Sequence, residues 1–469
     1  MILEQLKSLE QSDMYPFHMP GHKRNMACEA DIFGIDITEI DDFDNLHHPT
    51  GMIQEAQERA ARLYHAEKTY FVINGSTAGL LAGISACTKK GGRILMARNC
   101  HKAVYNAVFL RDLKPVYLYP ETDPLYGING GICPEEVERQ LECFADVQLV
   151  VITSPTYEGI VSDVKKIASI CQAHHVPLLV DEAHGAHFGL ADHEKLYKNA
   201  IQNGADVVIH SIHKTLPAPT QTALLHVNSG LVQEEKVRKY LSIYQTSSPS
   251  YVLMAYMDNC MQILEKQGRK LFDDYFKRID NVRKEAFSHI RIMGEELIGT
   301  CAIAGVDTGK LAISCAGTDK TGRQLYDYLR EKHHLQLEMA AGSYALAMTS
   351  VMDTEEGFAR LIRGLHEFDA LCDPANRQVS TEYPIQPKQF YSVSEAEEMP
   401  VKTVKLLESE GMAAADYVYL YPPGIPLIVP GEQICPEWLE KIAGCRQCGL
   451  TIEGLVGEDG GYIRVLVDN

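Results

Sequence analysis

Residues 206–219, with the sequence DVVIHSIHKTLPAP, decide how this chain is interpreted. The apolar run 206–210 is typical of a short buried strand, and Lys214 follows its carboxyl end, where open α/β sheets place their ligands. A desolvated lysine loses its proton readily and can form a Schiff base. Because Pro217 and Pro219 oppose helix growth, we expect Lys214 on irregular backbone. A lone lysine here would suit an ordinary surface loop as well, so its neighbours must decide.

Length and composition narrow the class of protein. A chain of 469 residues suggests two or three domains, and its formal net charge of −19 argues against nucleic acid or an anionic membrane as a partner. The thirteen cysteines are scattered, residues 1–4 lack a signal-peptide pattern, and no apolar run approaches the ~20 residues of a membrane span. We therefore expect a cytoplasmic protein in a reducing compartment. Cys445 and Cys448 form a CxxC without the further ligands of a zinc site, and whether they have a role stays open.

Apolar strands alternate with helices through the first half of the chain. Strands are expected at 69–73, 93–96, 115–118, 149–153, 177–180 and 206–210, with helices between them. This pattern predicts an α/β fold with a mostly parallel sheet covered on both faces, followed by smaller C-terminal α/β domains. The expected division is an N-terminal arm (1–50), a large domain (51–290), a small α/β domain (291–372), a linker (373–392) and a C-terminal domain (393–469).

Residues able to carry chemistry follow the carboxyl ends of these strands. Because those ends share one edge of a parallel sheet, their side chains should converge. Gly75, Ser76 and Thr77 open a helix, where the unpaired N–H groups and two hydroxyls could bind an anion, although Ser and Thr are also common as plain helix caps. The other members of the set are His101, Thr153, Asp181, Ser211, His213 and Lys214.

Pyridoxal phosphate requires groups of these kinds. Its aldehyde needs a lysine, its phosphate needs a helix N-terminus with hydroxyls, and its pyridinium nitrogen needs a carboxylate such as Asp181. His101 offers a flat ring for one face of the cofactor. Asp181, His184 and His187 could instead suggest zinc, but the lysine and the anion site would then have no role, so we expect no metal.

Six segments resemble the ornithine/lysine/arginine decarboxylase family. They are FHMPGHK (17–23), NGST (74–77), DEAHGAH (181–187), SIHK (211–214), QTSSPS (245–250) and YPPGIPL (421–427), which together span nearly the whole chain. The chain is similar to the shorter form of the family, without the N-terminal wing domain of the long enzymes. The resemblance implies the pyridoxal phosphate fold of the aspartate aminotransferase type.

The resemblance also implies roles for individual residues. Lys214 would bond to the cofactor, Asp181 would face the pyridinium nitrogen and His101 would stack on the ring. The remaining cofactor contacts would come from Gly75, Ser76, Thr77, Thr153, Ala183, Ser211 and His213. Thr246 or Ser247 would reach the phosphate of a neighbouring subunit, so the family match implies a homodimer or a higher homo-oligomer with active sites at the interface.

The expected activity is decarboxylation of a basic L-amino acid to its amine. Lys214, His213 and His184 are candidates for the acid that protonates Cα. Glu338, Glu158 and the acidic stretch 36–44 are candidate partners of a cationic side chain. Arginine is favoured by analogy with short-form relatives, and lysine and ornithine stay open.

Two other functions remain as alternatives at this point. One is an aminotransferase or a carbon–sulfur lyase on the same fold, and the other is a non-catalytic regulatory relative. His213 directly before Lys214 favours decarboxylation, and the intact set of lysine, aspartate and phosphate-binding residues argues against a loss of catalysis.

Overall fold

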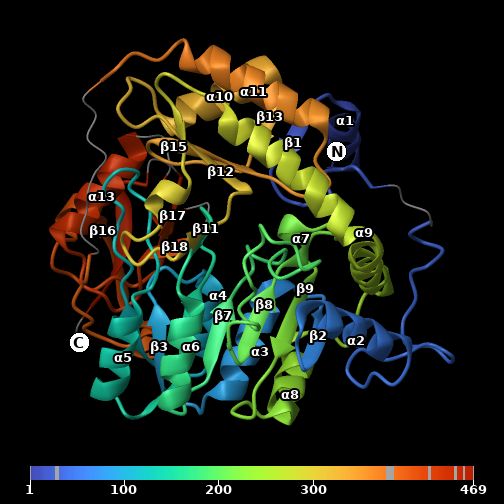
Figure 1. Ribbon diagram of the computed structural model, residues 1–469. Coiled ribbons are helices and arrows are strands. Elements are labelled where there is room, and N and C mark those ends of the chain that lie inside the picture. Colours follow the sequence, from blue (N-terminus) through green and yellow to red (C-terminus); the bar gives the residue numbers. More distant parts are fainter. Residues whose placement is uncertain are drawn as a thin grey trace.

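The computed structural model describes residues 2–26, 31–375, 385–420, 424–447, 451–457 and 460–467. Its centre is a seven-stranded sheet of order β2-β9-β8-β7-β5-β3-β4 (Figure 1). Five of these strands, β3, β4, β5, β7 and β8, run parallel, whereas β9 is antiparallel to both of its neighbours. The prediction of a mostly parallel sheet is confirmed. Strand β9 was not among the predicted strands. The bounds are β2 (Lys68–Val72), β3 (Arg93–Ala97), β4 (Lys114–Leu118), β5 (Val147–Thr153), β7 (Leu178–Asp181), β8 (Val207–His210) and β9 (Ala223–Val227).

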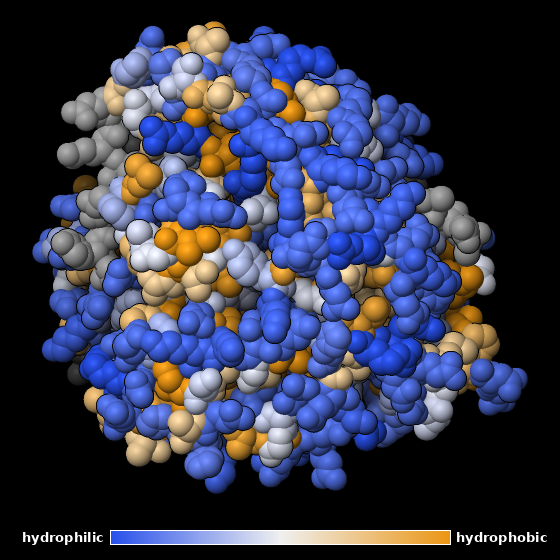
Figure 2. Space-filling model, in the orientation of Figure 1, coloured by the Kyte–Doolittle hydropathy of each residue, from blue (hydrophilic) through white to orange (hydrophobic). Residues whose placement is uncertain are grey.

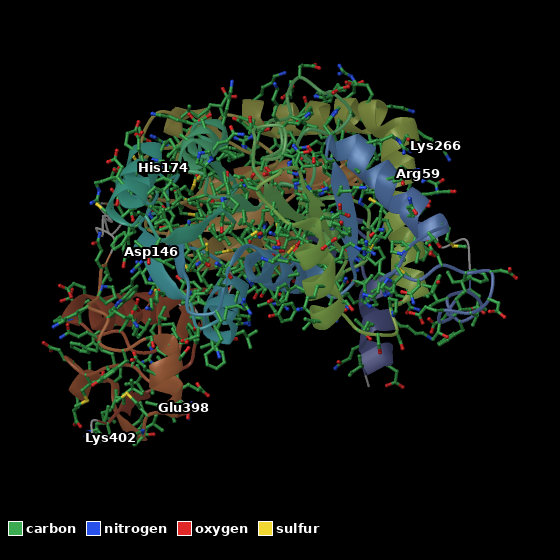
Figure 3. All side chains as sticks on the ribbon, turned by 90° about the horizontal axis from the view of Figure 1, so that it is seen from below. Arg59, Asp146, His174, Lys266, Glu398 and Lys402 are labelled. Carbon is green, nitrogen blue, oxygen red and sulfur yellow. The ribbon has the colours of Figure 1, made fainter. Side chains whose placement is uncertain are left out.

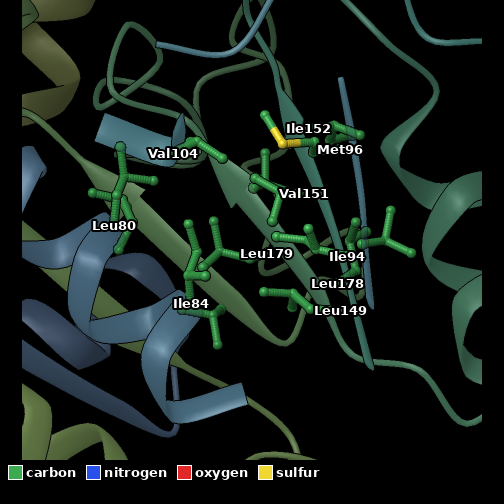
Figure 4. Packing of buried hydrophobic residues seen from close by; sticks show 14 of the residues in the cluster. Leu80, Ile84, Ile94, Met96, Val104, Leu149, Val151, Ile152, Leu178 and Leu179 are labelled. Carbon is green, nitrogen blue, oxygen red and sulfur yellow. The ribbon is translucent and has the colours of Figure 1, made fainter. Parts of the chain in front are cut away.

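The central strands are buried along their whole length. Every residue of β7, β8 and β9 is buried, and because successive side chains point to opposite faces, both faces of the sheet must be covered. Figure 4 shows Leu80 and Ile84 of α3 against Leu179 of β7 in this core. The helices that contribute to it are α3 (Gly75–Cys87), α4 (Lys102–Leu110), α5 (Pro134–Cys143), α6 (Val164–Ala173) and α8 (Glu234–Tyr244).

The 34-residue helix α9 (Tyr251–Lys284) leads from the large sheet to a smaller antiparallel one. That sheet has the order β10-β12-β15-β14, and its core is shared with α2 (Met52–Tyr64) and α9. Arg59 of α2 binds Asp258 of α9 at 2.9 Å, and Figure 3 shows Arg59 beside that helix. The remaining bounds of this part are β10 (Arg291–Ile292), β11 (Gly305–Val306), β12 (Lys310–Ser314), α10 (Gly322–His333), β13 (Leu335–Leu337), β14 (Met339–Ala340), β15 (Tyr344–Met348) and α11 (Glu355–Asp369).

The N-terminal arm is fixed to this smaller part and reaches the large sheet. After α1 (Ile2–Gln11), strand β1 (Tyr15–Phe17) pairs in parallel with β13. The backbone N–H of Gly21 then donates to the carbonyl of His213 at 2.7 Å. A Cβ on Gly21 would lie 2.7 Å from the backbone nitrogen of Leu216, so no other residue allows this close approach. The arm therefore supports the segment that carries Lys214.

The C-terminal segment forms a lobe with its own small core, seen at the edge of the molecule with Glu398 and Lys402 in Figure 3. It contains α12 (Val393–Glu398), β16 (Val401–Lys405), β17 (Val418–Leu420), β18 (Ile425–Ile428), α13 (Pro436–Gln447), β19 (Ile452–Glu453) and β20 (Tyr462–Leu466).

The large part and the small part of the molecule are also joined by pairing of β6 (Ile160–Val161) with β11. The domain boundaries stay predictions. None of the helices in the described residues is long and apolar enough to cross a membrane.

Candidate active site

The carboxyl ends of the central strands open into a cavity of about 330 Å³. The residues predicted to contact the cofactor within one subunit line this cavity together with His184: they are Gly75, Ser76, Thr77, His101, Thr153, Asp181, Ala183, Ser211, His213 and Lys214. Thr246 and Ser247 are exposed and do not line it. The structure therefore brings together the predicted set apart from the two residues expected to act on a neighbouring subunit.

Lys214 lies on α7 (Ile212–Thr215), a single helical turn. The expectation of irregular backbone was wrong, because Pro217 and Pro219 lie beyond the turn and end it rather than prevent it. The Nζ atom of Lys214 lies 2.8 Å from Nε2 of His184. Burial lowers the pKa of Lys214, although Asp181 opposes the shift. A lowered pKa increases the fraction of free amine, which is the nucleophilic form.

Asp181 is the last residue of β7 and lies opposite Thr153 of β5. It is buried, and its Oδ1 accepts the backbone N–H of Ala183 at 3.2 Å. Burial raises the pKa of Asp181, and Lys214 opposes this shift. A buried carboxylate with spare acceptor capacity at a cavity wall is suited to a protonated ring nitrogen, whose charge would stabilise the ionised form.

The first turn of α3 has no side-chain cap. Its N-cap residue Asn74 accepts the N–H of Thr246 instead, at 3.2 Å, and the hydroxyl of Ser76 lies 2.5 Å from that of Ser211. The opening residues of α3 line the cavity, so their N–H groups and the positive end of the helix dipole can bind an anion there. This arrangement favours anion binding over the alternative of a plain cap.

The two rings predicted to contact a cofactor are held in defined states. Nδ1 of His101 accepts the N–H of Ala103 at 3.2 Å, which leaves the ring proton on Nε2. Nδ1 of His213 lies 2.9 Å from the carbonyl of Thr222 and must donate to it, so Nε2 of His213 has no proton. Burial lowers the pKa of each ring to about 4, and both are neutral at neutral pH.

Two further carboxylates stand on the cavity wall. Glu338 accepts the backbone N–H of Met19 at 2.9 Å and the hydroxyl of Tyr157. Glu158 accepts the hydroxyl of Tyr344 at 2.8 Å. The stretch 36–44 does not line the cavity, and its Asp44 carboxylate instead accepts backbone N–H groups at the start of α2, from Thr50, Gly51 and Ile53.

Several lining residues were not predicted from the sequence. Asn99 follows β3, so the strand-end rule that found His101 would have found it too, and its Oδ1 is buried without a hydrogen-bond partner. Ile425 comes from β18 in the C-terminal lobe and belongs to the YPPGIPL segment (421–427), whose turn at 421–424 was expected to approach the mouth of the site, although Ile425 itself was not singled out. The others are Leu80, Asn129, Thr156 and Tyr157. Met19 also lines the cavity, and it belongs to the FHMPGHK segment, for which a loop at a ligand site was one of two open interpretations.

The histidines after Asp181 have separate partners. His184 contacts Lys214, whereas Nε2 of His187 lies 3.2 Å from Oδ2 of Asp307. In the described ranges, no group of three or more His, Cys, Asp or Glu side chains is placed to hold a metal ion. Cys448 of the CxxC and residues 421–423 of the YPPGIPL segment lie outside the described residues.

Comparison with known proteins matches both halves of the chain to one family. The sequence model described as Orn/Lys/Arg decarboxylase, major domain, matches residues 2–324, and the C-terminal domain of the same family matches residues 369–442. The arginine decarboxylase of Halalkalibacterium halodurans is 33% identical, covering 97% of this chain and 94% of the relative. The arginine decarboxylase of Bacillus subtilis is 31% identical, covering 96% of this chain and 94% of the relative. The solved lysine decarboxylase A of Pseudomonas aeruginosa has a TM-score of 0.75 at 20% identity, covering 92% of this chain and 74% of that one, which shows the shared fold.

Proposed function

Because this chain belongs to the Orn/Lys/Arg decarboxylase family, we propose that it uses pyridoxal phosphate to decarboxylate a basic L-amino acid, and that arginine is the substrate and agmatine the product. The observation that carries this proposal is the convergence of Lys214, Asp181 and the uncapped start of α3 on one cavity. A lysine, a buried carboxylate and an anion site are the three groups that this cofactor requires.

The residues of the cavity fit the cofactor. Lys214 would bond to its aldehyde, Asp181 would bind the ring nitrogen, and the α3 N-terminus with Ser76, Thr77 and Ser211 would hold its phosphate. The resemblance also implied His213 for the phosphate, but the Nε2 of this neutral ring has no proton to donate to an anion. His101 and Ala183 would lie against the ring. When bound, the cofactor accepts the electron pair that is released as the bond from Cα to the carboxylate breaks.

Proton transfer would be the task of Lys214 and His184. Their facing nitrogens are 2.8 Å apart, so a proton can be held at either atom or pass between them. His213 was a third candidate for the acid, but the bond from its Nδ1 to the carbonyl of Thr222 leaves Nε2 without a proton. At neutral pH His213 would therefore accept a hydrogen bond rather than supply a proton.

Substrate preference would depend on Glu158 and Glu338. Both carboxylates line the cavity, where they offer negative charge to a distal cation. A planar guanidinium can bind carboxylates with two parallel hydrogen bonds, whereas an ammonium acts as a point charge. The relatives at 31–33% identity are named arginine decarboxylases, which supports arginine over lysine or ornithine.

A second copy of the chain would complete the site in a homo-oligomer. We expect this homo-oligomer in the cytoplasm. Thr246 and Ser247 are exposed on the surface, as they must be to reach a neighbouring subunit. Apolar side chains of the arm are also exposed, including Phe33 and Phe43, and Figure 2 shows apolar side chains along the edge formed by the arm and α2. Contact with a second copy would remove these side chains from water.

The decisive experiment is a substrate panel. The purified protein, supplied with pyridoxal phosphate, is given arginine, lysine or ornithine, and carbon dioxide and amine are measured. We expect agmatine and carbon dioxide from arginine with the highest kcat/KM, and no turnover by Lys214→Ala. Lys102→Ala, which removes an exposed lysine beside His101, is the matched control and should remain active. Preference for lysine would overturn the substrate, and a keto acid product would overturn the reaction.

A further inference from the structure

His184 lies between two lysines that come from different parts of the fold. Its Nε2 is 2.8 Å from Nζ of Lys214, and its Nδ1 is 2.9 Å from Nζ of Lys310, the first residue of β12. Lys310 is only 2% exposed. Its aliphatic stem passes Gly159, where a Cβ would come within 2.8 Å of its Cγ. The packing of Lys310 therefore holds a buried amine against His184, the histidine that faces Lys214.

The two contacts limit the protonation of the three groups. An ammonium only donates hydrogen bonds, and a neutral imidazole has one nitrogen that donates and one that accepts. If both contacts are hydrogen bonds, at most one of the two lysines can therefore be an ammonium ion. Protonating His184 would leave it no acceptor, and burial lowers the pKa of this ring well below its usual value. One of the two lysines must be a neutral amine.

The surroundings decide which lysine keeps its charge. Asp307 stands beside Lys310, and although burial raises the pKa of Asp307, its pairing with His187 lowers the pKa below its usual value. Lys310 thus has an ionised counter-charge. Nζ of Lys310 also lies over the ring of Tyr157, 5.9 Å from its centroid, a position that favours a cation. The carboxylate that acts most strongly on Lys214 is Asp181, whose own pKa is raised by burial.

We propose that Lys310 is a positioning residue for Lys214. As an ammonium it donates to Nδ1 of His184, which places the ring proton on Nε2. Nε2–H in turn donates to Nζ of Lys214, which must then be the neutral amine, the form that attacks an aldehyde. The catalytic benefit of a neutral Lys214 rests on the function proposed for this residue. The direction of the two hydrogen bonds does not depend on that function.

Other charged groups near the triad of Lys310, His184 and Lys214 act on the same equilibrium. Burial lowers the pKa of Lys310 to about 8, Asp307 raises it, and a positive charge on Lys214 lowers it further. When Lys214 is the neutral amine, that last contribution disappears, which favours the ammonium form of Lys310. The remaining groups that face the triad are Glu158 and Glu338 on the cavity wall, Asp181 at the end of β7, and the rings of His101 and His213.

The test measures the protonation of Lys214 without turnover. The full-length protein is freed of bound aldehyde with hydroxylamine, dialysed, and labelled competitively with acetic anhydride between pH 6 and pH 10. Peptide mass spectrometry then gives the pH at which each lysine is half reactive. Lys310→Met should raise this midpoint for Lys214 by about one pH unit or more, since it removes both a positive charge and the donor to Nδ1.

Controls separate this effect from a general loss of charge. Lys102→Met removes an exposed positive charge beside His101 without touching His184 and should leave the Lys214 midpoint unchanged. Lys310→Arg keeps the charge and should hold the midpoint near the wild-type value. An unchanged Lys214 midpoint in folded Lys310→Met would overturn the proposal.

If Lys310→Met does not fold, as judged by circular dichroism, the wild-type protein decides. A lower midpoint for Lys214 than for Lys310 supports the proposed order, and the reverse ranking overturns it. The labelling experiment measures no decarboxylation. The Lys214 and Lys310 midpoints can therefore be interpreted even if the proposed substrate or reaction is wrong.

Discussion

Arg98 and Glu432 form a buried ion pair, with Nη2 and Oε2 3.0 Å apart, between the end of β3 and the C-terminal lobe. Arg98 also donates to the carbonyls of Pro426 and Leu427, at 2.7 and 3.0 Å. These carbonyls lie on β18, next to Ile425, which lines the cavity. The pair therefore fixes a wall of the active site as well as an interface.

Glu432→Ala should destabilise the lobe by about 3–5 kcal/mol, because it leaves the Arg98 charge buried without a counter-charge. The chain has a single tryptophan, Trp438, inside the lobe, so its fluorescence during urea unfolding reports this region. Asp416→Ala breaks the more exposed pair with Arg464 and is the matched control, expected to cost less than about 1 kcal/mol. Equal losses in the two variants would contradict the interpretation.

Gly21→Ala should reduce kcat/KM by about 100-fold, the scale of a 1 Å displacement of reacting groups. The new methyl group would meet the backbone at Leu216, directly after the helical turn that carries Lys214. Steady-state kinetics would check this, with circular dichroism to verify the fold. Gly444→Ala, where a Cβ meets no atom within 4 Å, should behave as wild type. Normal kinetics in Gly21→Ala would show that α7 tolerates the shift.

Glu158→Gln and Glu338→Gln should each raise the KM for arginine by about 10–100-fold, the equivalent of a hydrogen bond to a charged group. The reason is the loss of negative charge from the cavity wall at nearly constant shape. The exposed Glu331→Gln on α10 is the control and should keep the wild-type KM. If neither cavity variant changes KM, the distal cation binds elsewhere.

His101 should make the wild-type protein more sensitive to acid than a His101→Asn variant, in which the amide oxygen can still cap α4. Burial holds the folded pKa near 4, below the ~6.5 of an unfolded chain. The unfolded state therefore binds more protons between these values, and the free energy of unfolding falls as the pH falls through this window. Urea unfolding of the cofactor-free proteins should show wild type losing about 2 kcal/mol relative to the variant between pH 7.5 and pH 5. Parallel pH profiles would contradict this.

The parallel strands and most of the candidate site could be predicted because both follow local rules. An apolar run followed by Asp181 or Lys214 identifies a strand and the edge at which it ends. Strand β9 was not predicted, since it runs back against β8 without the crossover helix that marked the others. The single turn at Lys214 depends on bonds such as Leu216 N–H to the Ile212 carbonyl, which no periodicity announces.

Residues from other domains were the second limit of sequence reasoning. Lys310 begins a strand of the small sheet, and only the packing of β12 near Gly159 brings it to His184. Ile425 reaches the cavity because Arg98 holds β18. Such contacts depend on how domains dock, and no spacing within either segment encodes them.

The long-range ties of the arm and the lobe also set an order for making this site on the ribosome. Met19 is held by Glu338, 319 residues later, and Arg98 meets Glu432, 334 residues later. A nascent chain that already contains Lys214 and Asp181 therefore lacks the walls that shield them from water. The reactive lysine stays in an open half-site until Glu432 has been translated.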